Sequence, residues 1–313
     1  MNTQLALECP HCGAEVLADD EFCERCGASL AERRRQWDHV ELDRGAAAGV
    51  TDRGLVHSRN EDALFVEASA AGAVAVVCDG VSTANAPDRA AQVAAAAAGE
   101  LLATAFSEPS SARLSRRGVG RPSRCLRDAL DAADHAVRAV PWLPIRGGGA
   151  PACTIVAALW DGVSVSIGWA GDSRAYWIGA EAASCLTRDH SWAFEQVEAG
   201  RLTPDEAEAD GRAHAITRWL GDDAPDGGGD TRTIRPPGPG RLVICSDGLW
   251  NLVPTAGELA ELIASTTRDP QPPMPLDLAR ALTAVALSRG ARDNVTVAVI
   301  DVVPSAPGAV HDA

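Results

Sequence analysis

The stretch Ala73-Val74-Ala75-Val76-Val77-Cys78-Asp79-Gly80 is a run of small and β-branched apolar residues that ends in an aspartate and a glycine. The same arrangement returns at Leu242-Val243-Ile244-Cys245-Ser246-Asp247-Gly248. A third stretch, Ile167-Gly168-Trp169-Ala170-Gly171-Asp172, has the glycine before the aspartate. Apolar runs of this length, bounded by turn residues, predict buried strands. The sequence therefore predicts several core strands that each end in a carboxylate.

These aspartates need an explanation because aspartate is disfavoured inside strands. A single Asp-Gly is an ordinary turn. Three aspartates at the ends of apolar runs, with Asn60-Glu61-Asp62 and Asp293-Asn294 each placed before a further β run, suggest that the carboxylates meet at one point. Buried carboxylates repel one another unless cations lie between them. Oxygen ligands suit Mg²⁺ or Mn²⁺, and two such ions, roughly 3.5–4 Å apart, would activate a water for phosphate-ester hydrolysis.

The remaining patterned segments predict an α+β sandwich in which helices cover antiparallel sheets. Strands are expected at Leu64–Val66, Ala73–Cys78, Thr154–Trp160, Val163–Ala170, Ala175–Ile178, Leu242–Cys245 and Val295–Val303. Helices are expected at Asp88–Phe106, after Ser123 as the N-cap, after the capping box Thr203–Glu206, at Ala256–Thr266, and at Leu276–Ser288 before Gly290.

Composition excludes several classes of function. The chain has 313 residues, of which 46% are hydrophobic, and a net charge of −15. Such an acidic surface argues against nucleic acid as a partner. All 28 basic residues are arginine, which excludes Schiff-base chemistry and a Walker-type P-loop because both need lysine. We expect no membrane contact and a cytoplasmic location, because no signal peptide or membrane span is evident.

Two Cys-x-x-Cys pairs, Cys9 with Cys12 and Cys23 with Cys26, lie close to the N-terminus. Four thiolates complete a tetrahedral Zn²⁺ site without an open position, so the predicted ion is structural. The alternative is a redox pair, but a redox motif normally follows a strand in a βαβ unit, and none is indicated here. The module resembles the zinc ribbons at the N-termini of many bacterial proteins, and we expect it to dock an unknown protein.

The chain is thus divided into a zinc ribbon (1–30), a charged linker (31–45), a large α+β domain (46–304) and a tail (305–313). The linker contains Arg33-Arg34-Arg35, which we interpret as solvated.

Six ordered motifs in the large domain resemble those of type 2C protein phosphatases, the PPM family. They are Thr51-Asp52-Arg53-Gly54 with Asn60-Glu61-Asp62, Cys78-Asp79-Gly80-Val81, Gly171-Asp172-Ser173-Arg174-Ala175-Tyr176, Leu186-Thr187-Arg188-Asp189-His190-Ser191, Ser246-Asp247-Gly248-Leu249-Trp250 and Arg292-Asp293-Asn294-Val295-Thr296. The resemblance spans about Ala46 to Val303. It implies a four-layer αββα sandwich and a phosphatase that hydrolyses phosphoserine and phosphothreonine with a water activated between two Mn²⁺ or Mg²⁺ ions.

The resemblance also implies roles for individual residues. Asp79 would bridge the two ions and the carbonyl of Gly80 would contact one of them, while Asp247 and Asp293 would ligate the other. The remaining implied positions are Glu61 and Asp62 as ligands of the ions or of their waters, Asp172 for a third, weaker ion, and Asn294 as a support for Asp293. The segment 190–212 corresponds to the flap beside the active site, and the implied substrates are proteins phosphorylated by a bacterial Ser/Thr kinase.

Two features depart from the family pattern. Many relatives grip the substrate phosphate with an arginine four residues before the glutamate, and this chain has His57 there. Arg59 would share a face with His57 in an extended strand, so both residues are candidates for phosphate binding. The loop from Val81 to Asp88 lacks the family's glycines, and Val81 cannot act as a general acid.

Two alternative functions stay open at this point. One is a weakly active or inactive relative that binds phosphoproteins or a kinase as a regulator. A zinc-ribbon protein that binds nucleic acid is the other alternative, and the negative charge disfavours it.

Overall fold

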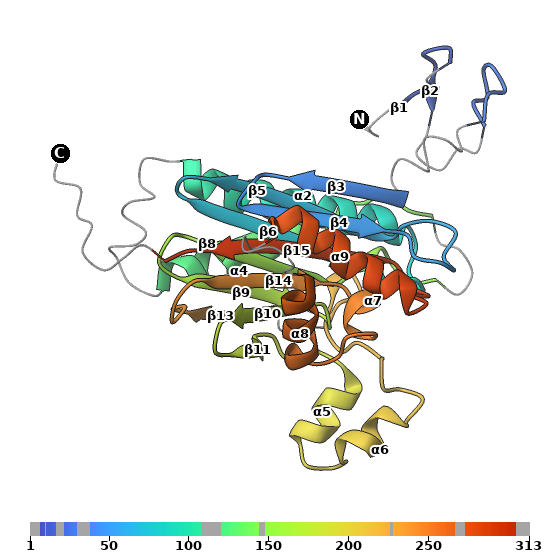
Figure 1. Cartoon of the computed structure of the whole chain (residues 1–313). Coiled ribbons are helices and arrows are strands. Elements are labelled where there is room, and N and C mark those ends of the chain that lie inside the picture. The colour runs from blue at the N-terminus through green and yellow to red at the C-terminus, as the bar shows by residue number, and fades with distance from the viewer. Residues whose placement is uncertain are drawn as a thin grey trace.

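The computed structural model describes residues 7–9, 11–16, 22–29, 38–107, 120–143, 148–225, 228–266 and 273–304. Two antiparallel sheets dominate the fold, and Figure 1 shows them stacked between helices. The six-stranded sheet has the order β11-β10-β14-β15-β4-β3, with bounds Ala183–Cys185, Arg174–Gly179, Gly240–Cys245, Val295–Val302, Ala47–Asp52 and His39–Asp43. The five-stranded sheet has the order β13-β9-β8-β6-β5, with bounds Asp230–Ile234, Val165–Ala170, Ile155–Trp160, Gly72–Asp79 and Asp62–Ser69.

Helices cover the outer face of each sheet. On the five-stranded sheet lie α2 (Pro87–Ser107) and α4 (Gly120–Arg138), and on the six-stranded sheet lie α8 (Ala256–Thr266) and α9 (Pro275–Ser288). Figure 1 shows α8 and α9 in front of the strands and α2 and α4 behind them. The expected four-layer αββα sandwich is therefore confirmed, and each predicted strand overlaps an observed one.

Three apolar layers hold this sandwich together. One lies between α2, α4 and the five-stranded sheet, one between the two sheets, and one between the six-stranded sheet and α8 and α9. Alanines dominate the inner face of α2, and a Cβ at its Gly99 would lie 2.2 Å from the ring of Phe65. The small residues thus allow α2 to approach strand β5 closely.

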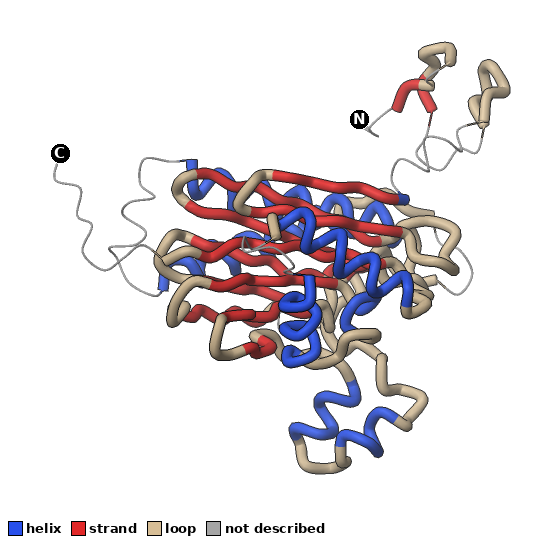
Figure 2. The backbone as a smooth tube through the Cα atoms, in the orientation of Figure 1, coloured by secondary structure: helices blue, strands red, loops and turns tan. Residues whose placement is uncertain are grey.

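Smaller elements complete the fold. A two-stranded ladder pairs β7 (Ala152–Cys153) with β12 (Leu220–Gly221), and α7 (Asp247–Trp250) follows β14 directly. The flap contains α5 (Trp192–Glu198) and α6 (Pro204–Glu208), which Figure 2 shows in blue below the sheets. The predicted capping box at the start of α6 is confirmed: the Thr203 side chain accepts from Glu206 N–H, and the Glu206 side chain accepts from Thr203 N–H.

The structure differs from expectation in several respects. His39–Asp43, assigned to the linker 31–45, is strand β3 at the edge of the six-stranded sheet, so the large domain begins before residue 46. Ser123 is not an N-cap, because α4 already begins at Gly120; its hydroxyl lies 3.0 Å from that of Thr233. Strands β4, β7, β11, β12 and β13 were not expected. The motif Arg33-Arg34-Arg35 and the tail lie outside the described residues.

None of the helices in the part of the chain that the structure describes combines the length and apolar character needed to cross a bilayer.

Candidate active site

Asp62 and Asp79 occupy the same end of one strand pair. Asp62 begins β5, Asp79 ends β6, and the antiparallel register places them directly opposite each other. Side chains of directly opposed residues project from the same face of a sheet. The backbone oxygen of Asp79 accepts a 2.7 Å hydrogen bond from Thr154 N–H, which fixes the end of β6 against β8.

Asp62 is also held from the other sheet. Its Oδ2 accepts hydrogen bonds from the hydroxyls of Ser246 at 2.8 Å and Thr296 at 2.7 Å. Ser246 follows β14 and Thr296 lies in β15, so one carboxylate joins the two sheets. Its second oxygen, Oδ1, is buried without a hydrogen-bond partner.

The carboxylates of Asp247 and Asp293 come from the six-stranded sheet. Asp247 is the first residue of α7, and its Oδ2 accepts from Asn251 at 3.1 Å. Asp293 precedes β15, and its Oδ1 accepts from the N–H of Asn294 at 2.8 Å. The Oδ1 of Asp247 is buried and unpartnered.

The electrostatics show that these carboxylates converge. Burial raises the pKa of Asp79 well above its usual range, and the charges of Asp62, Asp247, Asp172 and Asp293 raise it further. Burial likewise raises the pKa of Asp247 to about 6, of Asp62 to about 7 and of Asp172 to about 8. Carboxyl groups from five separate chain segments therefore act on one another. Four of them are desolvated, whereas the Asp293 side chain is 44% exposed.

Glu61 and Asn294 connect the loop after β4 to this cluster. Glu61 N–H donates to Asn294 Oδ1 at 2.7 Å, and the Asn294 amide donates to the backbone oxygens of Arg53 at 2.8 Å and Arg59 at 3.1 Å. Glu61 Oε1 accepts from Arg59, whereas Oε2 is buried without a partner. Asn294 thus fastens the Glu61 loop to the strand that follows Asp293.

The residues present fit divalent cations. Three buried carboxylate oxygens lack a hydrogen-bond partner: Glu61 Oε2, Asp62 Oδ1 and Asp247 Oδ1. An unpaired carboxylate oxygen in a desolvated site is costly, and hard cations bound beside these oxygens would remove that cost. The donor set consists of oxygens, as Mg²⁺ and Mn²⁺ prefer.

Gly80 begins the loop that follows β6 and that departs from the pattern the resemblance implies. A Cβ at Gly80 would lie 2.6 Å from the carbonyl oxygen of Pro87 and 2.8 Å from that of Glu61, so only glycine fits there. Asn85 donates to the Gly149 carbonyl at 2.6 Å. Ala86 adopts a φ of +50°, which is strained for a residue with a side chain. The loop after Gly80 is therefore fastened to the segment around Gly149.

Asp172 lies in the turn between β9 and β10, which His190 supports. His190 Nδ1 accepts from Gly171 N–H at 3.1 Å, and its backbone N–H donates to the Gly171 oxygen at 3.0 Å. Because Nδ1 accepts, the proton of the neutral ring is on Nε2, which lies 3.2 Å from Asp230 Oδ2. Burial lowers the pKa of His190, so the neutral ring is favoured.

His57 and Arg59 do not lie on a common strand face, because residues 54–61 form turns and loop. His57 Nε2 lies 3.2 Å from Asp293 Oδ1. The Arg59 guanidinium lies between two acids: its Nε donates to Glu61 at 2.9 Å, and its NH1 group lies 3.6 Å from Asp88. Both candidates for phosphate binding thus border the carboxylate cluster from different sides.

Sequence reasoning assigned no role in shaping the site to Ser246, Thr296 or Asp88. Ser246 and Thr296 belong to quoted motifs, so their position beside motif aspartates was the available signal. No pattern in the sequence indicated the contact of Asp88 with Arg59, because it joins a helix to a distant loop.

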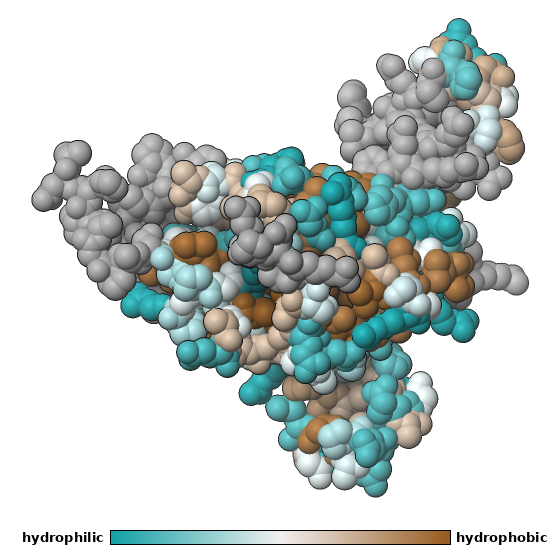
Figure 3. Space-filling model, viewed as in Figure 1, coloured by the Kyte–Doolittle hydropathy of each residue, from teal (hydrophilic) through white to brown (hydrophobic). Residues whose placement is uncertain are grey.

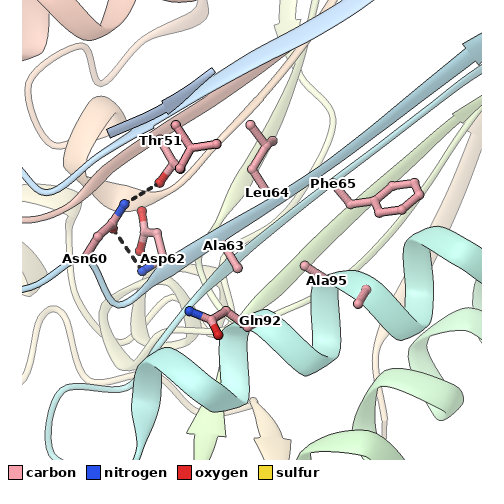
Figure 4. A pocket seen from close by; sticks show the side chains of 10 residues that line it. Thr51, Asn60, Asp62, Ala63, Leu64, Phe65, Gln92 and Ala95 are labelled. Atoms are coloured by element: carbon pink, nitrogen blue, oxygen red, sulfur yellow. Dashed lines mark hydrogen bonds between the residues drawn. The ribbon is translucent and has the colours of Figure 1, made fainter. Parts of the chain in front are cut away.

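A cavity of about 270 Å³ approaches Asp62 between β5, β3, β4 and α2. Figure 4 shows Thr51, Asn60 and Asp62 at one end, with Leu64, Phe65 and Ala95 along the walls. Its polar groups pair mostly with one another: Asn60 donates to Thr51 at 2.8 Å and accepts from Asp62 N–H at 3.2 Å. The mainly apolar lining offers no cationic side chain to a phosphate.

The four N-terminal thiols form a separate group. Their sulfur atoms all lie within 4.8 Å of one another, with Cys9 and Cys26 at 3.7 Å and Cys12 and Cys23 at 3.7 Å. Each knuckle turns through a glycine of positive φ, Gly13 at +66° and Gly27 at +67°. Burial acts to raise the pKa of Cys9, but backbone hydrogen bonds from His11 and Cys12 lower it to about 6. The group has the donors and spacing of a tetrahedral zinc site.

Comparison with known proteins identifies both parts of the chain. The sequence profile of the family "Protein phosphatase 2C" matches residues 55–283, and that of a zinc-ribbon domain matches residues 9–30. The serine/threonine protein phosphatase PstP of Mycobacterium tuberculosis (strain ATCC 25618 / H37Rv) is 31% identical over 259 residues, which are 82% of this chain and 45% of PstP. The serine/threonine phosphatase Stp of Listeria innocua is 29% identical over 256 residues, which are 80% of this chain and 93% of Stp.

The fold has relatives among solved structures. The catalytic domain of PstP in complex with two manganese ions superposes with a TM-score of 0.58 and 27% identity, covering 82% of this chain and 97% of that one. The chain spans about half the length of the first curated relatives that it matches. Since the family profile covers most of the sequence and the sandwich agrees with it, this chain belongs to the protein phosphatase 2C family.

Proposed function

We propose that this protein hydrolyses phosphoserine and phosphothreonine in phosphorylated proteins. The observation that carries the proposal is the gathering of Glu61, Asp62, Asp79, Asp247 and Asp293 with three buried carboxylate oxygens unpaired. The names of the relatives support the same activity, since PstP and Stp are serine/threonine phosphatases. When bound, two Mn²⁺ or Mg²⁺ ions supply a Lewis acid for the phosphoryl group and lower the pKa of a water.

Each acidic residue has a proposed part in holding the ions. The charges of Asp62, Asp247, Asp172 and Asp293 all act on Asp79, so Asp79 would help to hold both ions, with the Gly80 carbonyl beside it. Asp247 and Asp293 would hold one ion, Glu61 and Asp62 would hold ions or their waters, and Asp172 would hold a third, weaker ion. Asn294 positions Asp293 and Glu61 through its hydrogen bonds.

The chain's own residues would bind the substrate phosphate. Arg59 is the stronger candidate, because Glu61 and Asp88 orient its guanidinium, and a planar guanidinium pairs well with phosphate. His57 beside Asp293 is the second donor. Val81 offers no proton to the leaving serine or threonine oxygen, so that proton must come from elsewhere in the site.

The N-terminal module has a different proposed role. One structural Zn²⁺ bound by Cys9, Cys12, Cys23 and Cys26 would fold the ribbon. The ribbon would then dock a protein partner, and a cytoplasmic setting suits its reduced thiols. The opposing enzyme would be a bacterial Ser/Thr kinase.

A metal titration tests the proposed activity. We expect hydrolysis of p-nitrophenyl phosphate and of phosphothreonine peptides to rise with Mn²⁺, and to be lost in Asp79→Ala and in Asp247→Asn. A chain that binds phosphopeptides but shows no turnover at any Mn²⁺ concentration would instead be a phosphoprotein- or kinase-binding regulator. The histidine at position 57 and the altered loop after Gly80 favour that second function.

A further inference from the structure

Two neighbouring apolar side chains lie exposed on the loop that joins β4 to β5. Leu55 is 59% exposed and Val56 is 60% exposed. In Figure 3, hydrophobic surface appears at the right-hand end of the sandwich, where Figure 1 shows this loop. Single exposed apolar residues are ordinary, but an adjacent pair beside a catalytic cluster is a candidate contact surface.

The loop holds these side chains in a fixed position. Gly54, with a φ of +71°, donates its N–H to Asp52 Oδ1 at 2.8 Å. Leu55 N–H donates to the Ala291 oxygen at 3.0 Å, and the Arg53 guanidinium donates to the carbonyl of His57. These bonds tie the loop on both sides of Leu55 and Val56, so a ligand would not have to order it.

The same bonds place the pair beside the carboxylates. Ala291, which accepts from Leu55, lies two residues before Asp293. His57 follows Val56 and its ring lies 3.2 Å from Asp293. A phosphate bound near His57 and Arg59 would therefore leave the neighbouring residues of its peptide close to Leu55 and Val56.

We propose that Leu55 and Val56 form a docking surface for an apolar side chain of the substrate, close in sequence to the phosphorylated residue. The inference rests on the proposed phosphatase function and names its substrate class: phosphopeptides with a leucine-like residue near the phosphoserine or phosphothreonine. Burial of apolar surface on both partners supplies the affinity, and the fixed loop avoids an ordering cost.

The test compares pairs of phosphothreonine peptides that differ by leucine or glutamine at one position within three residues of the phosphothreonine. We expect kcat/KM to be about tenfold higher for the leucine peptide at the preferred position, as for other small apolar contacts. In the double variant Leu55→Gln, Val56→Thr, this preference should disappear while turnover of p-nitrophenyl phosphate stays unchanged. Val303→Gln is the matched control, because Val303 is 67% exposed at the other end of β15.

Binding measurements separate this inference from the proposed activity. The same peptides with a non-hydrolysable phosphonate in place of the phosphate are titrated by fluorescence anisotropy, so no turnover is needed. A leucine preference that only the double variant loses supports the surface, even if the enzyme proves inactive. Equal affinity for leucine and glutamine peptides at every position overturns it, as does a preference that survives in the double variant with an unchanged melting temperature.

Discussion

The hydroxyl of Ser246 donates a 2.8 Å hydrogen bond to Asp62 Oδ2, from one sheet of the sandwich to the other. Thr296 donates to the same oxygen at 2.7 Å. Two donors on Oδ2 fix the carboxylate and leave Oδ1 as the oxygen without a protein partner. The orientation of Asp62 thus depends on both sheets.

Removal of the Ser246 hydroxyl should weaken the binding of Mn²⁺. We expect Ser246→Ala to reduce Mn²⁺ affinity about tenfold or more, because groups that orient ligand carboxylates typically contribute 10–100-fold. The Mn²⁺ dependence of p-nitrophenyl phosphate hydrolysis and calorimetric titration both measure it. Ser288→Ala is the control, since that hydroxyl bonds only within α9. Identical Mn²⁺ curves for Ser246→Ala and wild type would contradict the role given to Asp62.

The metal-free protein should lose stability as the pH rises from about 4 to about 8. Folded-state pKa values of about 6 for Asp247, 7 for Asp62 and 8 for Asp172 exceed the value of about 3.9 for unfolded aspartate. Across this range the folded chain holds more protons than the unfolded chain, so the free energy of unfolding falls.

Thermal unfolding at pH 5 and pH 8, with and without Mn²⁺, measures this effect. Saturating Mn²⁺ should restore stability at pH 8, because the bound cation neutralises the carboxylates that have lost their protons. Asp172→Asn should show a smaller loss than wild type in the metal-free state. A metal-free melting temperature that is as high at pH 8 as at pH 5 would count against a crowded carboxylate cluster.

Loss of the Arg59 guanidinium should affect substrate binding. We expect Arg59→Ala to raise KM for a phosphothreonine peptide about tenfold or more, since a charge-assisted hydrogen bond to phosphate is lost. His57→Ala should have the smaller effect. Steady-state kinetics check this, with Arg188→Ala as a control because Arg188 pairs with Glu198 on the flap surface. If His57→Ala raises KM more than Arg59→Ala, the two assignments must be exchanged.

Each chain should bind one Zn²⁺ that the catalytic reaction does not need. Cys23→Ser should lose this zinc, because three thiolates and a hydroxyl make a weaker site. Elemental analysis gives the zinc content, and p-nitrophenyl phosphate turnover gives the activity. Cys185→Ser, at an exposed cysteine outside the thiol group, should keep the zinc. A Cys23→Ser chain that retains a full equivalent of zinc would exclude the four-thiolate site.

The sequence predicted buried strands such as β6 and β8, because continuous apolar runs identify them. It did not predict the edge strands β3, β11 and β13. It also missed β4, which is buried but carries a glycine and two polar residues in place of a continuous apolar run. In β3, the residues His39-Val40-Glu41-Leu42-Asp43 alternate between exposed and half-buried positions and carry charges, so the segment looks like a linker. Edge strands owe their structure to pairing with a neighbour, which periodicity along one segment does not report.

The candidate site, like the fold, could be predicted only in part from the sequence. The convergence of Asp79, Asp247 and Asp293 could be expected, because strand ends in a sandwich share an edge. The contacts that orient them could not, since Ser246 and Asp62 are 184 positions apart and no local pattern links them. The geometry of Arg59 was missed for the same reason, because Asp88 lies on a different element.

The tight fit of Gly54 has a consequence for protein engineering. A Cβ at this position would lie 2.0 Å from the carbonyl oxygen of Asp293, so any other residue there would shift the backbone of Asp293, a proposed metal ligand. A mutant library aimed at new peptide preferences should therefore randomise Leu55 and Val56 and keep position 54 constant. The library would then contain more variants that keep catalytic activity while their preference among peptides changes.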